Sequence, residues 1–193
     1  MNGLFKTIKG ERLNLIKLNL KYLDDFHEYS LNPKLYLHLG LLKPPTNKKY
    51  SKKFLEDLIS RSDKINGYWW FVYLKKEKKV IGSIGAHNLD FKRRSTEISY
   101  AISPNFWKNG FFSESIQLLI KRFVIENNFQ RIFAITDKDN IASIKSLKKN
   151  CFREEGTLRN FTISSHNKFK DATLLSFCSQ YDLGRFKKKK ISF

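Results

Sequence analysis

The spacing of apolar residues changes twice in the middle of this chain, and that change limits its fold more than any other feature. Three β-rich runs follow one another across short turns, which is typical of an antiparallel meander: GYWWFVYL (67–74), KKVIGSIGAHNL (78–89) and STEISYAI (95–102). Helical spacing replaces the alternation over 113–124, and RIFAIT (131–136) then returns to a strand pattern. A helix therefore connects the meander to the strand at 131–136, and no hairpin joins that strand to the meander.

Weaker patterns of the same kinds flank this region. We expect strands at 10–19, 152–161 and 173–180, and helices at 23–29, 54–59 and 141–147. The resulting order predicts an α+β fold, with a mixed central β-sheet flanked by helices. Since 193 residues suit a single core, we expect one domain over 1–183 and a basic C-terminal tail over 184–193.

Composition excludes several classes of protein. A hydrophobic content of 41% is that of a globular chain, and no stretch approaches the 18 apolar residues of a membrane span. Cys151 and Cys178 have neither metal-binding nor disulfide-framework spacing, so we expect no metal and a cytoplasmic protein. The net charge of +19 either attracts a polyanion such as nucleic acid, ribosome or CoA, or reflects lysines that only solvate the surface.

The stretch NFWKNGFFSESI (105–116) joins a strand to a helix. Its backbone N–H groups at 109–113 and the partial positive charge of the helix N-terminus suit a pyrophosphate. Gly110 permits positive φ or a close approach, and Lys108 adds a formal charge. The alternative is an ordinary turn.

Five segments in order resemble the GNAT superfamily of acyl-CoA-dependent N-acetyltransferases, and most of all its ribosomal-protein N-terminal acetyltransferases. They are GERLNLIKL (10–18), VIGSIG (80–85), EISYAISPNFWKNGFFSES (97–115), DNIASIKSLKKNCFREEGTLR (139–159) and DATLLSF (171–177). The resemblance implies acetyl-CoA as co-substrate, with the strands 95–102 and 131–136 splayed to admit its pantetheine arm. The residues it implies for CoA binding are Ala101, Ile102, Ser103, Lys108, Asn109, Gly110, Phe111, Phe112, Ser113, Asn140 and Ser143.

Three positions depart from the family pattern. Phe112 stands where a small residue is usual, so its ring either crowds the pyrophosphate or packs into the core. Cys151 replaces the glycine of a helix–strand turn, and we expect Asn150 to take the left-handed cap conformation instead. Leu147 occupies the position of a tyrosine that many members use as an acid, which favours a route through a hydroxyl or water.

Proton transfer needs a base near the acyl site and a donor near the leaving sulfur. Glu97 is the candidate base, unless it only pairs with Arg93 or Arg94. By resemblance, Ser143 donates to the sulfur. Asn140 either faces CoA or is a helix N-cap. His87 is a second candidate base or an acceptor ligand, unless it is simply a half-exposed histidine at a strand end.

The ease of neutralising the acceptor amine suggests its identity. An α-amine titrates near about 7.7–8.0, whereas a lysine side chain near about 10.4 costs about 4 kcal/mol to neutralise. This favours a protein N-terminus, with a nucleotide-linked amino sugar as the alternative and a possible ribosome contact through the basic surface. A third hypothesis, from a different class, is a non-catalytic RNA- or ribosome-binding module on the same fold.

Overall fold

The computed structural model describes residues 4–64, 67–164 and 167–189. Within them, eight strands form one sheet in the order β1-β2-β3-β4-β5-β6-β8-β7. The strands are β1 (Ile8–Lys9), β2 (Leu13–Lys17), β3 (Gly67–Leu74), β4 (Lys79–Asp90), β5 (Ser95–Ile102), β6 (Arg131–Asp137), β7 (Arg153–Ile163) and β8 (Phe169–Cys178). Neighbouring strands are antiparallel except β5 and β6, which are parallel because α3 carries the chain across between them. The expected mixed sheet is confirmed.

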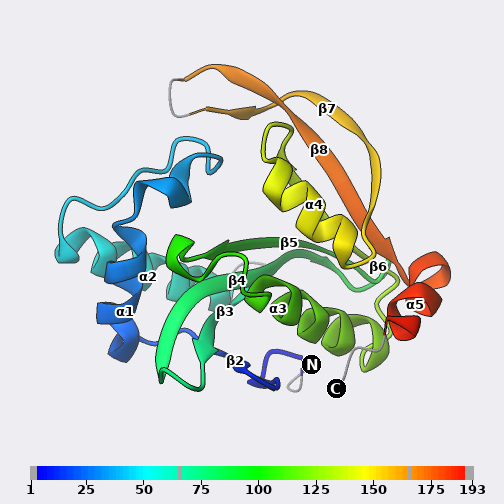
Figure 1. Ribbon diagram of the computed structural model, residues 1–193, viewed down its shortest axis with the longest axis horizontal. Helices are drawn as coiled ribbons and strands as arrows, with labels where there is room; N and C mark the ends of the chain where they lie inside the picture. Colours follow the sequence, from blue (N-terminus) through cyan, green and yellow to red (C-terminus); the bar gives the residue numbers. More distant parts are fainter. Residues whose placement is uncertain (1–3, 65–66, 165–166, 190–193) are drawn as a thin grey trace.

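Helices cover both faces of the sheet (Figure 1). They are α1 (Leu23–Ser30), α2 (Lys48–Lys64), α3 (Phe111–Ile120), α4 (Ile141–Lys149) and α5 (Ser179–Lys188), with a π-helical turn extending α3 over Lys121–Ile125. In the part of the chain that the structure describes, no helix is long and apolar enough to cross a membrane.

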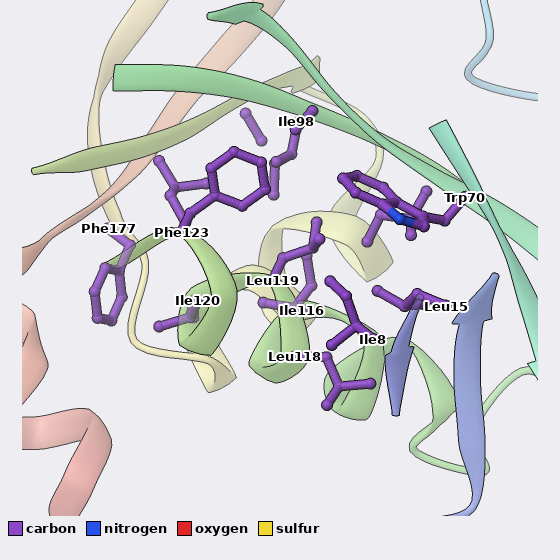
Figure 2. Packing of buried hydrophobic residues seen from close by; sticks show 14 of the residues in the cluster. Ile8, Leu15, Trp70, Ile98, Ile116, Leu118, Leu119, Ile120, Phe123 and Phe177 are labelled. Atoms are coloured by element: carbon purple, nitrogen blue, oxygen red, sulfur yellow. The ribbon is translucent and has the colours of Figure 1, made fainter. Parts of the chain in front are cut away.

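Two hydrophobic clusters lie on opposite faces, and the alternation of β3 separates them. Trp70 is fully buried in the larger cluster, where Ile116 and Leu119 of α3 face the sheet (Figure 2). The next residue, Phe71, is fully buried in the smaller cluster with Phe26 of α1. Adjacent strand residues point to opposite faces, so the apolar run of β3 is buried on both sides.

The parallel strands β5 and β6 separate after a short contact. Their paired residues are Ser95 with Arg131, Thr96 with Ile132, and Glu97 with Phe133. Beyond Glu97, β5 continues through residues 98–102 without pairing to β6, while β6 pairs with β8 up to Asp137. Figure 1 shows β5 and β8 diverging, with α4 between them. The predicted splay is confirmed.

The structure departs from expectation at two places in the second half of the chain. Cys151 takes the left-handed conformation (φ 69°), whereas Asn150 has φ −95°, so the prediction of a left-handed cap at Asn150 is wrong. The side chain of Asn150 bonds instead to Ser113 and Gln117 of α3. The predicted tail boundary at 183/184 falls inside α5, whose Phe186 is fully buried in the core.

Candidate active site

The loop between β5 and α3 has the backbone shape of an anion site. Lys108 (φ 65°) and Gly110 (φ 79°) both adopt the left-handed conformation, which is costly for a lysine and typical of strained functional loops. Gly110 is the N-cap of α3 and offers no capping side chain. The first N–H groups of the helix, from Phe111 to Ser113, therefore remain available to a ligand oxygen, and they fit a pyrophosphate.

Arg12, the residue immediately before β2, holds this loop in place. Its Nε donates to the carboxylate of Glu114 at 2.8 Å, and its Nη1 donates to the carbonyl of Asn109 at 2.9 Å. The guanidinium also lies 4.7 Å from the centre of the Phe111 ring. Sequence reasoning missed Arg12 because 102 residues separate it from Glu114. The loop is thus fixed by a residue beside β2, three strands away from β5 in the sheet.

Phe112 packs inward rather than into the loop. It is partly buried against the larger hydrophobic cluster, and its ring centre lies 4.3 Å from that of Tyr100 on β5. The structure therefore favours the core-packing interpretation of this residue. The Phe112 ring also supports the ring of Tyr100 where β5 and β6 separate.

The backbone groups that face the opening come from alternate residues of β5. The carbonyl of Arg94 accepts from β6, so even-numbered residues face β6 and the opening, whereas the N–H of Ser103 donates to Ile81 on the β4 side at 2.8 Å. Of the predicted segment from Ala101 to Ser103, only Ile102 turns its backbone to the opening. Its carbonyl accepts from the Trp107 indole at 2.6 Å. Tyr100, which sequence reasoning omitted, turns its backbone to the same side.

Ser143, in the first turn of α4, lies at the centre of a hydroxyl cluster. Its Oγ is 2.6 Å from the Tyr100 hydroxyl, and the Thr136 hydroxyl donates to it at 3.3 Å. The Asn140 side chain accepts from the Ser143 N–H at 3.1 Å, so Asn140 is the N-cap of this helix. Burial raises the pKa of Tyr100 to about 12, which keeps its hydroxyl protonated. Leu147, at the position where the family pattern has a tyrosine, is buried in the core.

Glu97 and His87 form a second cluster across β4 and β5. The Asn88 amide donates to Glu97 at 2.8 Å, and His87 Nδ1 lies 3.8 Å from the same carboxylate oxygen. Asn88 reaches it because a bulge after His87 shifts the register of the two strands. Arg93 pairs instead with Asp90, at 3.8 Å. Burial lowers the pKa of His87, and the opposing charge of Glu97 partly offsets this.

Comparisons with known proteins agree with this geometry. The family described as Acetyltransferase (GNAT) domain matches residues 12–153. The chain belongs to this family. An uncharacterized N-acetyltransferase, p20, from Bacillus licheniformis is 29% identical over 156 residues, covering 81% of this chain and 87% of the relative.

Two solved structures share the fold at low sequence identity. RimL, the ribosomal L7/L12 alpha-N-protein acetyltransferase, was solved with coenzyme A and matches with a TM-score of 0.78 at 18% identity, covering 90% of this chain and 98% of RimL. The Microcin C7 self immunity acetyltransferase MccE, solved with acetyl-CoA and AMP, matches with a TM-score of 0.77 at 20% identity. The match covers 87% of this chain and 93% of MccE. Both of these neighbours were thus solved with acetyl-CoA or CoA.

The two clusters of this GNAT acetyltransferase lie on opposite faces of β5, because the side chains of Glu97 and Tyr100 alternate. On the Glu97 face, a cavity of about 710 Å³ opens beneath α1 and α2. Ser99 and Ala101 of β5 line its floor, and Trp69 lines its wall while stacking on the His87 ring at 5.6 Å between ring centres. Tyr100 also lines the cavity, which therefore reaches the part of β5 that no longer pairs with β6, starting two residues beyond Glu97.

Proposed function

We propose that this N-acetyltransferase moves the acetyl group of acetyl-CoA to the α-amine of a protein N-terminus, by direct attack in a ternary complex. The observation that carries the proposal is the separation of β5 from β6 after Glu97. At that point a carboxylate lies on one face of β5 and the Tyr100–Ser143 hydroxyl pair on the other. Family membership favours this enzyme over a non-catalytic RNA-binding module.

The residues of the β5–α3 loop suit the role of pyrophosphate ligands. The N–H groups at the start of α3 and the Lys108 ammonium supply positive charge, and Arg12 fixes the loop. The backbone of Tyr100 and Ile102 faces the opening, where an amide-bearing pantetheine arm supplies the missing strand partner. Acetyl-CoA contributes the thioester carbonyl that the amine attacks.

Glu97 is the proposed base, with His87 beside it as the alternative. The amine nitrogen bonds to the thioester carbon, the carbon–sulfur bond breaks, and the proton of the amine passes to Glu97, directly or through water. Burial lowers the pKa of His87, which leaves its imidazole in the neutral form but makes it a weaker base than a solvent-exposed histidine. Because an α-amine has a pKa of about 8, a weak base such as a carboxylate or a neutral imidazole is enough to take its proton.

Ser143 is the proposed donor to the leaving sulfur, and its hydrogen-bond inventory supports this role. A serine hydroxyl has one proton and two acceptor sites. Thr136 donates to Ser143, and we assign the donor role in the 2.6 Å contact to Tyr100, whose raised pKa keeps its hydroxyl protonated throughout the neutral range. With both acceptor sites used, the single proton of Ser143 is free to stabilise the thiolate. Tyr100 and Thr136 are then positioning residues.

Thiol release from acetyl-CoA, measured against two acceptor panels, tests the function. One panel contains short peptides with free N-termini, and the other contains nucleotide-linked amino sugars. Turnover with peptides supports the proposal and makes the basic surface a candidate for ribosome contact. Turnover only with amino sugars contradicts the proposed acceptor and assigns the positive charge to a diphosphate.

A further inference from the structure

The acceptor cavity has a chemical character that the catalytic residues do not explain. Its volume of about 710 Å³ falls in the range of pockets that enclose a small ligand, about 300–1,000 Å³. Most of its lining is aromatic or aliphatic: Phe26, Tyr29, Leu35, Tyr36, Leu39, Leu42, Pro44, Pro45, Tyr50, Phe54, Leu58, Trp69, Tyr100 and Ala101. Such a surface gains free energy by covering an apolar group.

Polar groups in the inner part of the cavity already bond to one another. Burial raises the pKa of Tyr29, whose hydroxyl bonds to Ser83. Ser51 Oγ lies 2.8 Å from His27 Nδ1, and Tyr36 donates to the carbonyl of Ser30 at 2.9 Å. A sugar hydroxyl or a phosphate entering here loses water without gaining these groups as partners. The inner wall therefore favours an apolar substituent.

Positive charge gathers at the outer end instead. Lys43 and Lys53 line the cavity, and Lys49 and Lys53 border an adjoining hollow on α2. The acidic residues there, Asp57 in the cavity and Glu56 in the hollow, pair with Arg61 and Lys52. Among the residues that the structure describes, Lys43, Lys49 and Lys53 have no acidic side chain within ion-pair distance, although neighbouring Lys52 approaches Glu56 at 3.8 Å. These three lysines form an unpaired basic rim, complementary to an acidic ligand.

We propose that the acceptor is a polypeptide whose N-terminal residue has a large apolar or aromatic side chain, with acidic residues close behind it. This inference rests on the proposed function. The α-amine lies over Ser99 beside Glu97, the first side chain fills the cavity against Phe26 and Trp69, and the next residues leave across the basic rim. A serine or alanine at the first position leaves most of the lining in contact with water.

A matched peptide series tests this assignment. Peptides beginning with Phe, Leu, Ala or Ser, each followed by either Asp-Glu or Asn-Gln, are compared by kcat/KM. We expect Phe and Leu to exceed Ala and Ser by about 10- to 100-fold. The acidic pair adds a further gain of about two- to fivefold that shrinks at high salt.

Each result has a distinct meaning. Equal or better turnover of the Ser and Ala peptides overturns the inference and leaves the proposed function intact. Acceptance of nucleotide-linked amino sugars with no peptide turned over removes both. If the acidic peptides are not preferred, or if their preference does not change with salt, the role of the rim is overturned.

Two matched pairs of variants locate the effect. Phe54 and Phe91 are both 47% exposed, but only Phe54 lines the cavity. We expect Phe54→Ala to lower kcat/KM for the Phe peptide about three- to tenfold relative to the Ala peptide, whereas Phe91→Ala leaves that ratio unchanged. Lys53→Gln, which removes one of the three rim charges, should reduce the preference for acidic peptides, whereas Lys9→Gln on strand β1 should leave it unchanged. Equal effects within either pair contradict the proposal.

Discussion

The hydroxyl of Tyr100 lies 2.6 Å from that of Ser143, although the two residues come from β5 and α4 and are 43 positions apart. The contact exists because β5 leaves β6 just before Tyr100, so that α4 can approach the strand through the gap. A tyrosine thus reaches the site from an element other than the one on which the family pattern places it.

Removing the Tyr100 hydroxyl should slow catalysis without weakening co-substrate binding. Tyr100→Phe keeps the ring against Phe112 and deletes one hydrogen bond to Ser143, with a cost of about 1 kcal/mol. We expect kcat to fall about fivefold and the dissociation constant of acetyl-CoA, measured by calorimetry, to stay the same. A purely structural role for Tyr100 predicts loss of acetyl-CoA affinity together with kcat.

The raised pKa of Tyr100 also makes stability depend on alkaline pH. In the unfolded chain this phenol ionises near 10.0, whereas burial holds its pKa in the folded protein at about 12. The unfolded state therefore loses its proton first, and the free energy of unfolding falls between pH 10 and pH 12 by up to about 1.4 kcal/mol per pH unit. The difference in free energy of unfolding between the wild type and Tyr100→Phe, measured by urea titration, should change with pH only in this window.

Gly110 should be essential to the loop. A Cβ at this position would meet Arg12 Nη2 at 3.3 Å, on a backbone whose positive φ disfavours any side chain. We expect Gly110→Ala to cost about 1 kcal/mol of stability and to weaken acetyl-CoA binding at least fivefold. Gly184→Ala is the control, since nothing lies within 4 Å of its added Cβ. Unchanged affinity in Gly110→Ala would refute the pyrophosphate assignment.

Glu97→Gln should lower turnover while sparing acetyl-CoA affinity. The amide keeps the shape of the side chain beside Asn88 but no longer accepts a proton from the amine. We expect kcat to fall about 10²-fold, the lower end for a lost general base. If kcat is unchanged from pH 6 to pH 9, Glu97 has no part in proton transfer and His87 becomes the base to substitute next.

Glu155 should link stability to acid pH. The Arg131 guanidinium, at 2.5 Å, lowers the pKa of this carboxyl to about 2 from 4.5, and Ser176 adds a hydrogen bond. Its contribution is present above pH 4.5 and is lost as the pH falls toward 2. Glu155→Gln should flatten the acid limb of a stability-against-pH curve. An identical acid limb in both proteins would show that the pair contributes nothing measurable, as many exposed pairs do.

Local patterns in the sequence determined the order of the elements, the crossover after the meander and the glycine of the β5–α3 loop. These features depend on residues close in the chain, because apolar period and turn chemistry act over a few positions. The positive φ of Gly110 was predictable for that reason. The preference of Asn150 for a left-handed cap was equally local, and it failed because α3 engages the side chain of Asn150.

Tertiary structure alone decided which side chains meet. The contacts of Tyr100 with Ser143 and of Arg12 with Glu114 join segments that no sequence period connects. The cavity beneath α1 and α2 likewise arises where these helices cover one face of the splayed sheet, so its lining is scattered over residues 26–101. Sequence specified each element and its buried face, but the site depends on how far two strands separate, which the packing of whole helices determines.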